Sequence, residues 1–190
     1  MEASDGDLLR RYRAGEVSAL ETLVERYRRG LFGYILNMTG NRHEAEDVFQ
    51  EVWLRAIRKI GLYRQKNFFG WLLRIAHNLI VDRARRRKPD VSLDQETEEG
   101  ASMMQTIAAG GPGPAGRAAA RETGGRIVRL VQRLPAEQRE VLVMRLRSGL
   151  SFREIAAVQK ASINTVLARM RYACEKLRPL LKEEYGALGR

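Results

Sequence analysis

Apolar residues recur every three or four positions through two long stretches of this chain, and no other feature constrains its fold as strongly. A period of 3.6 residues places such side chains on one face of an α-helix, whereas a half-buried strand would alternate apolar and polar residues. Ala45, Val48, Val52, Ala56 and Ile60 form the clearest such stripe. Because the sequence contains no run of strand-like alternation, we predict an all-α protein.

The segment from Lys88 to Gly125 separates the two stretches. It is rich in Gly, Ala and Pro and has little apolar periodicity, which is typical of a flexible connection. A chain of 190 residues with 44% hydrophobic content can bury one ordinary core or two small ones. We therefore expect two small helical domains, over residues 1–88 and 122–190, joined by a flexible acidic linker over residues 89–121.

Capping residues divide the first domain into four expected helices. Ser4 and Asp7 have the spacing of a capping box and predict a short first helix. The apolar pattern predicts three longer helices, over about residues 18–40, 42–60 and 68–87. The last of these turns five apolar residues towards the core: Leu72, Ile75, Ala76, Leu79 and Ile80.

The second domain has the pattern of a helix-turn-helix. After a helix over about 121–134, Pro135 can begin a new helix that Gly149 ends. Ser151 and Glu154 form another capping box, which opens a short helix, and Ser162 can cap a last helix reaching about residue 181. A short helix, a tight turn and a longer basic helix are typical of DNA-binding modules, although a purely structural helical hairpin gives the same pattern.

Charge is divided unevenly along the chain. Of the net charge of +11, residues 1–88 carry +7, residues 89–116 carry −5 and residues 117–190 carry +9. Two basic lobes favour a polyanionic partner, nucleic acid first and a membrane surface second. No stretch has the roughly 20 apolar residues of a membrane span, so we expect a cytoplasmic protein without membrane insertion. The single cysteine, Cys174, is expected to pack in a helix.

Aromatic residues gather just before the fourth helix, beside a basic run. Tyr63, Phe68 and Phe69 could stack on unpaired bases, whereas core packing is expected of Trp71. On the third helix, a second stripe mixes acidic, amide and apolar side chains and has a simpler interpretation as a solvated face. Taken one at a time, neither feature indicates a function.

The order of these features resembles the sigma-70 family, in its compact extracytoplasmic-function group, over nearly the whole chain. AEDVFQEVWLRAIRKI (Ala45 to Ile60) is similar to the family's core-polymerase-binding helix, and GWLLRIAHNLIVDRARR (Gly70 to Arg86) to its helix for the −10 element. The segments from Leu134 to Val158 and from Asn164 to Leu180 resemble its −35-binding domain.

The resemblance implies three sets of contact residues. The core-polymerase set, facing the beta-prime clamp, is Asp47, Gln50, Glu51 and Leu54. The −10 set, which captures a flipped base, is Tyr63, Lys66, Asn67, Phe68, Phe69, Asn78, Asp82, Arg83 and Arg86. The −35 set is Ser162, Asn164, Thr165, Leu167, Ala168, Arg169, Arg171 and Tyr172.

Two departures from the family pattern bear on specificity. The loop between Tyr63 and Trp71 is slightly shorter than the common family form, which bears on the preferred flipped base. Leu167 and Ala168 stand where many relatives carry arginine and serine, so we expect an atypical −35 element.

The resemblance also implies the partners and the absence of catalysis. The implied partners are the beta and beta-prime subunits of core RNA polymerase, promoter DNA and an anti-sigma protein. The free factor is expected to be a monomer. A nucleic-acid enzyme is not expected, because His43 and Asp47 alone make a poor metal site and no phosphate-binding glycine loop is present. We thus expect no catalytic residues, metal or cofactor.

Two further alternatives remain at this stage. A helix-turn-helix regulator acting without polymerase core would explain residues 122–181 but leave the first domain without a role, and it would commonly act as a dimer on a palindrome. An interaction protein that binds only other proteins is the third hypothesis.

Overall fold

The computed structural model describes residues 3–64, 67–87, 127 and 129–186, and these residues contain helices and turns but no strand. The predicted all-α fold is confirmed. The predicted linker, residues 89–121, and Lys66 lie outside the described residues. The elements are α1 (Asp5–Arg13), α2 (Val17–Thr39), α3 (Arg42–Lys59), η1 (Ile60–Leu62), α4 (Phe68–Arg87), α6 (Ala136–Ser148), α7 (Phe152–Gln159) and α8 (Ile163–Gly186).

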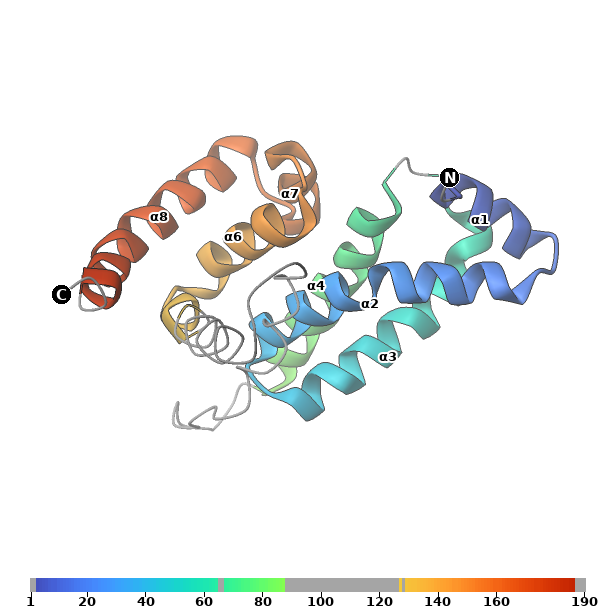
Figure 1. Ribbon diagram of the computed structural model, residues 1–190, viewed down its shortest axis with the longest axis horizontal. Coiled ribbons are helices and arrows are strands. Elements are labelled where there is room, and N and C mark those ends of the chain that lie inside the picture. Colours follow the sequence, from blue (N-terminus) through green and yellow to red (C-terminus); the bar gives the residue numbers. More distant parts are fainter. Residues whose placement is uncertain (1–2, 65–66, 88–126, 128, 187–190) are drawn as a thin grey trace, which may run out of the picture.

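Helices α1 to α4 pack together as a first lobe, with α2 in contact with α1, α3 and α4 (Figure 1). The predicted stripe of α3 is buried along its full length, from Ala45 to Ile60. On α4, Leu72, Ala76 and Leu79 are buried, and the other two predicted core residues are partly buried against them. The periodicity of the sequence therefore identified the inner faces of both helices.

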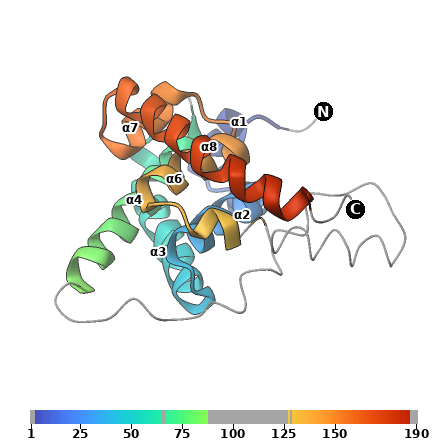
Figure 2. The same ribbon diagram turned by 90° about the vertical axis from the view of Figure 1, so that its left-hand side faces the viewer.

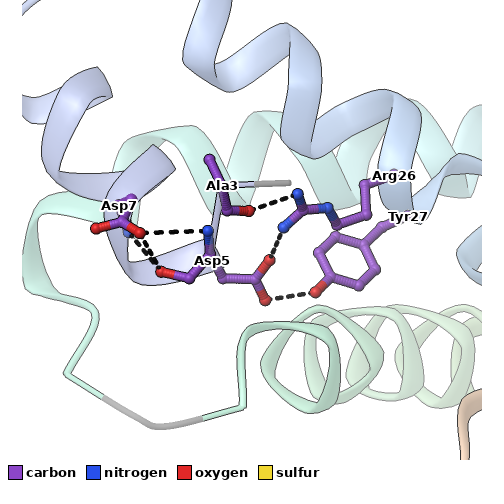
Figure 3. A network of polar contacts seen from close by, with 6 residues as sticks. Ala3, Asp5, Asp7, Arg26 and Tyr27 are labelled. Atoms are coloured by element: carbon purple, nitrogen blue, oxygen red, sulfur yellow. Dashed lines mark hydrogen bonds and ion pairs between the residues drawn. The ribbon is translucent and has the colours of Figure 1, made fainter. Parts of the chain in front are cut away.

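Polar contacts at the start of the chain fix α1 on α2. Ser4 and Asp7 form the predicted capping box. Asp5 then bridges to α2: it accepts hydrogen bonds from Arg26 Nη1 at 2.6 Å and from the hydroxyl of Tyr27, while Arg26 Nη2 donates to the carbonyl of Ala3 at 2.7 Å (Figure 3). Such charge-assisted bonds give α1 one orientation on α2.

Helices α6, α7 and α8 form a second lobe with the predicted helix-turn-helix. Ser151 and Glu154 form the expected capping box, and α7 ends at Lys160, whose φ of 51° is left-handed. That conformation, usually taken by glycine, turns the chain sharply into α8. Helix α8 contains Pro179 and continues to Gly186, past the predicted end near residue 181. Pro179 is exposed, so the backbone carbonyl that its ring leaves unbonded faces the solvent side.

The two lobes are in contact with each other. Helix α6 lies on α2 and α7 lies on α4, and both views show the second lobe seated on one side of the first (Figure 1, Figure 2). Buried apolar residues from the two lobes belong to one continuous cluster.

Candidate protein and nucleic-acid interfaces

The outer face of α3 carries the stripe predicted to bind a protein. Asp47 and Gln50 are exposed, and Leu54 leaves 51% of its surface in solvent. Glu51 is half-buried, and its Oε1 accepts a hydrogen bond from Arg55 Nε at 2.7 Å. Ile57, one turn further along, is an exposed apolar side chain that the sequence analysis did not include. Its spacing of three from Leu54 was the signal that could have identified it.

The aromatic residues before and at the start of α4 form a packed cluster. Phe68 is 1% exposed, and its ring lies 5.4 Å from that of Tyr63 and 5.5 Å from that of Trp71, measured between centroids. Trp71 packs against the core, as predicted. Phe69 is half-buried and stacks on Tyr27 at 4.9 Å. The rings of Phe68 and Tyr63 thus face the interior of the first lobe, and Phe69 is the most accessible of the three predicted stacking residues.

Two side chains hold the ends of the segment between α3 and α4 (residues 60–67), here called the −10 loop because predicted −10 residues lie in it. Arg13 Nη2 donates to the carbonyls of Ile60 and Tyr63 at 2.9 and 2.8 Å. Asn67 Oδ1 accepts from the backbone of Gly70 at 2.8 Å and so caps α4. The amide nitrogen of Asn67 donates across to Glu154 Oε1 on α7 at 2.5 Å. One predicted −10 residue is therefore in contact with the second lobe.

The remaining predicted −10 residues lie further along α4, between residues 78 and 86. Asn78 and Arg83 are half-buried, whereas Asp82 and Arg86 are exposed. They carry an amide, a carboxylate and two guanidinium groups, which can bond to base edges and phosphates.

The first turns of α8 present polar side chains to solvent. Ser162 Oγ accepts from the backbone of Thr165 at 3.0 Å, which caps the helix. The guanidinium of Arg171 lies 4.9 Å from the ring of Tyr172, and Arg169 Nη1 donates to Gln159 Oε1 on α7 at 2.8 Å. Of the predicted −35 set, Ala168 and Arg169 are half-buried, and the exposed members are Ser162, Asn164, Thr165, Leu167, Arg171 and Tyr172.

Known proteins match this chain along most of its length. Residues 23–89 match the family model of sigma-70 region 2, and residues 124–177 match that of sigma-70 region 4. The extracytoplasmic-function (ECF) RNA polymerase sigma factor SigW of Bacillus subtilis is 33% identical over 178 residues, covering 92% of this chain and 95% of SigW. The chain belongs to the sigma-70 family, in its extracytoplasmic-function group. The RNA polymerase sigma-H factor of Pseudomonas aeruginosa is also 33% identical, over 193 residues that cover 96% and 98% of the two chains.

Solved structures agree on the fold of the sigma factor. CnrH, solved in complex with the cytosolic domain of CnrY, is 23% identical with a TM-score of 0.64, covering 95% of this chain and 99% of CnrH. The sigma factor RpoE of Bartonella quintana, solved with the anti-sigma factor NepR, is 19% identical with a TM-score of 0.63, covering 86% and 96%. As a member of this family, the chain is a transcription initiation factor that binds core RNA polymerase, recognises −10 and −35 promoter elements and promotes DNA melting.

One buried carboxylate of the sigma factor links its two lobes. Glu140, on α6, is 4% exposed. Its Oε1 accepts from the hydroxyl of Tyr34 on α2 and lies 2.7 Å from His77 Nδ1 on α4, and its Oε2 accepts from Gln159 Nε2 on α7 at 2.7 Å. Because an ionised carboxylate only accepts, His77 carries its proton on Nδ1 here. Sequence analysis did not single out Glu140, although a charge next to the apolar run from Val141 to Met144 was a signal.

The Glu140 network predicts that stability depends on pH. Burial alone raises the pKa of Glu140, but hydrogen bonds from His77, Tyr34 and Gln159, together with the charge interaction with His77, hold that pKa below the ordinary 4.5. A pKa lowered by folding adds stability that is complete above 4.5 and is lost as pH falls through the folded-state pKa. Between about pH 6 and pH 3, we expect Tm to fall more in the natural chain than in Glu140→Gln, measured by circular dichroism. Parallel Tm profiles would contradict this expectation.

The described residues contain no group of three or more His, Cys, Asp or Glu side chains that could hold a metal ion. Within the same residues, no helix is both long and apolar enough to cross a membrane.

Proposed function

We propose that this sigma factor docks on core RNA polymerase through the outer face of α3, with Asp47, Gln50, Glu51 and Leu54 as its contacts and Ile57 as an extension. The single observation that carries this assignment is that two apolar side chains, Leu54 and Ile57, remain exposed beside acidic and amide groups on a helix whose other face is fully packed. Apolar groups flanked by polar ones are characteristic of a protein interface.

We propose that the −10 element is read at the −10 loop and on α4. Asn67, Phe69, Asn78, Asp82, Arg83 and Arg86 are the proposed contacts, together with Lys66, which lies outside the described residues. Tyr63 and Phe68 are buried, so they would support the base-binding surface from beneath rather than stack directly on the base. Extruding a base costs a few kcal/mol, so a pre-formed support for the stacking side chain lowers the cost of capture.

We propose that the −35 element is read by the first turns of α8. Ser162, Asn164, Thr165, Arg171 and Tyr172 offer hydrogen bonds and charge to a major groove, and Leu167 offers an exposed apolar surface that suits a thymine methyl group. Ala168 completes the surface, and Arg169 joins it once released from Gln159. A recognition helix of this composition supports the expectation of an atypical −35 element.

The rest of the assignment follows from the family. We propose a division into residues 1–88, a linker over 89–121 and residues 122–190, with the polymerase supplying all catalysis. The proposed partners are the beta and beta-prime subunits, promoter DNA and an anti-sigma protein. The last is supported by the structure of the sigma factor RpoE of Bartonella quintana in complex with the anti-sigma factor NepR. We also propose that the free factor is a cytoplasmic monomer.

Binding to core polymerase tests the proposal. The variant Asp47→Ala, Gln50→Ala, Leu54→Ala removes three side chains but retains Glu51, which is paired with Arg55. We expect its affinity for purified core to fall about 100-fold, because a few central side chains carry most of the energy of such interfaces. The matched control is Glu21→Ala, Glu25→Ala on the exposed face of α2, which should bind normally. If neither the natural chain nor the control binds core, the helix-turn-helix regulator becomes the better account.

A further inference from the structure

Phe69 is the most accessible of the three predicted stacking residues, and helix α2 contacts its ring on two sides. The ring is nearly parallel to that of Tyr27, with 15° between the planes and 4.9 Å between the centroids. Its tip points at Gly30: a Cβ at Gly30 would lie 2.8 Å from Phe69 Cζ and 3.4 and 3.6 Å from the two Cε atoms. A Cβ does not approach another carbon so closely, so glycine at position 30 allows the ring to lie where it does.

Gly30 lies well inside a helix, where glycine is unfavourable for the helix itself. Helix α2 runs from Val17 to Thr39, and Gly30 is far from both of its ends. Glycine loses more backbone freedom on folding than alanine does, so alanine would make the more stable helix at this position. The close approach of the Phe69 ring is the physical reason that the structure offers for a glycine here.

The ring beneath Phe69 is fixed in turn by the start of the chain (Figure 3). The hydroxyl of Tyr27 donates to Asp5 Oδ2, and Asp5 Oδ1 accepts from Arg26 Nη1 at 2.6 Å. Burial, together with the hydrogen bond to Asp5 and its charge, raises the pKa of Tyr27 above the ordinary value, so the hydroxyl remains a donor. The position of α1 therefore fixes the ring on which Phe69 stacks.

These contacts leave one face of the Phe69 ring for a ligand. Tyr27 covers one face and Gly30 lies at the tip, yet Phe69 is only half-buried. An aromatic face is the surface on which an unpaired base stacks, whatever the base. A ring that is already held in place loses little conformational freedom when the base arrives, which favours capture.

We propose that Tyr27 and Gly30 are positioning residues for −10 recognition: they hold the Phe69 ring so that its face away from Tyr27 stacks on the extruded base. Asp5 contributes through the hydroxyl of Tyr27. This inference rests on the −10 reading proposed above, and it adds residues of α1 and α2, which lie outside the predicted −10 set.

Two variants alter the support of the ring without removing the ring. Gly30→Ala places a Cβ against the tip and forces the ring aside, and alanine should not weaken α2 itself. Tyr27→Phe keeps the stacking partner but loses its hydrogen bond to α1. Gly6→Ala is the matched control, because a Cβ at this helical glycine meets only Ser4 Oγ, at 3.7 Å. Circular dichroism should show the same helix content in all three variants.

Binding of the holoenzyme to pre-melted promoter DNA measures the stacking. The probes are promoters whose −10 non-template strand carries an abasic site at one position at a time, and the position at which the abasic site lowers affinity identifies the extruded base. With the intact base, we expect binding to weaken about 10-fold in Phe69→Ala, about 5-fold in Gly30→Ala and about 3-fold in Tyr27→Phe. On the abasic DNA these losses should disappear, and Gly6→Ala should match the natural chain on both.

A double-mutant cycle separates positioning from a structural role. If Gly30 acts through Phe69, Gly30→Ala should cause no further loss in a protein that already carries Phe69→Ala. An equal loss in both backgrounds, or on abasic DNA, would overturn the inference, because Gly30 would then only stabilise the lobe.

Two other outcomes distinguish this inference from the function on which it rests. Normal binding by Gly30→Ala and Tyr27→Phe, beside weak binding by Phe69→Ala, would overturn the positioning roles and leave the −10 reading intact. If Phe69→Ala binds normally and no abasic site lowers affinity, the −10 reading at this surface is itself refuted, and the positioning roles with it.

Discussion

Replacing Phe68 with alanine should lower the free energy of unfolding by about 3–5 kcal/mol, the largest stability effect expected of a single substitution in the first lobe. Phe68 is 1% exposed and lies among the rings of Tyr27, Tyr63, Trp53 and Trp71. Removing its ring would leave a cavity that four large side chains cannot easily fill. The −10 loop rests on this cluster, so we expect Phe68→Ala also to reduce transcription from promoters that the sigma factor must melt.

The two tryptophans of the chain report directly on this substitution. Trp53 and Trp71 both lie beside Phe68, with centroids 6.5 and 5.5 Å away. Urea unfolding followed by tryptophan fluorescence therefore measures the stability of the lobe around the cavity. Phe69→Ala is the matched control: Phe69 is half-buried and stacks on Tyr27, so we expect about half the loss. A loss below about 1 kcal/mol for Phe68→Ala would show that the cluster does not support the lobe.

The helices of this protein could be predicted from its sequence because capping residues and apolar periodicity are local features. Ser4 with Asp7 and Ser151 with Glu154 each satisfy backbone donors within one turn, so each capping box depends only on residues that are close together in the sequence. The stripe from Ala45 to Ile60 is likewise set by the helical period alone. These features required no knowledge of which helix would cover which.

The contacts between distant segments were not readable in the same way. Glu140 is a charged residue on a helix, and such a residue is ordinarily expected to face solvent. It is buried because Tyr34 and His77 lie opposite it. Phe68 and Phe69 are adjacent and chemically identical, but only the packing of Tyr63 and Tyr27 decides which ring is buried and which is accessible. Periodicity assigns a residue to a face and does not identify the partner of that face.

The same distinction applies to the candidate interfaces. The stripe of α3 could be predicted because its members share a face, and its exposure agrees with that prediction. Arg169 shares a face with other predicted −35 residues, but Gln159 holds it in a network that extends to α4. Sequence resemblance therefore predicts which residues contact DNA, and the structure adds that one of them, Arg169, is hydrogen-bonded to Gln159 of α7.

The variant Arg83→Ala, Arg86→Ala should weaken binding of promoter DNA by the polymerase holoenzyme roughly 60-fold at 0.1 M salt. Both arginines lie on the C-terminal half of α4, beyond the proposed −10 contacts Asn78 and Asp82. Each phosphate contact contributes a salt exponent of about 0.9 on duplex DNA, so two contacts supply about 1.8 powers of ten at this salt concentration. On single-stranded DNA the exponent is about 0.7 per contact, and the loss falls to roughly 25-fold.

The salt dependence separates a phosphate contact from a general effect of charge. The control Arg10→Ala, Arg11→Ala removes the same two charges from α1, which lies far from the C-terminal end of α4 (Figure 1). Binding of duplex and pre-melted promoter DNA is measured for both variants over a series of salt concentrations. If Arg83 and Arg86 contact phosphates of the melted strand, the salt slope falls by about 1.4 on pre-melted DNA, whereas the control changes it by well under one. Equal slopes in the two variants would place the arginines outside the DNA path, and the basic end of α4 would then act only through the net charge of the lobe.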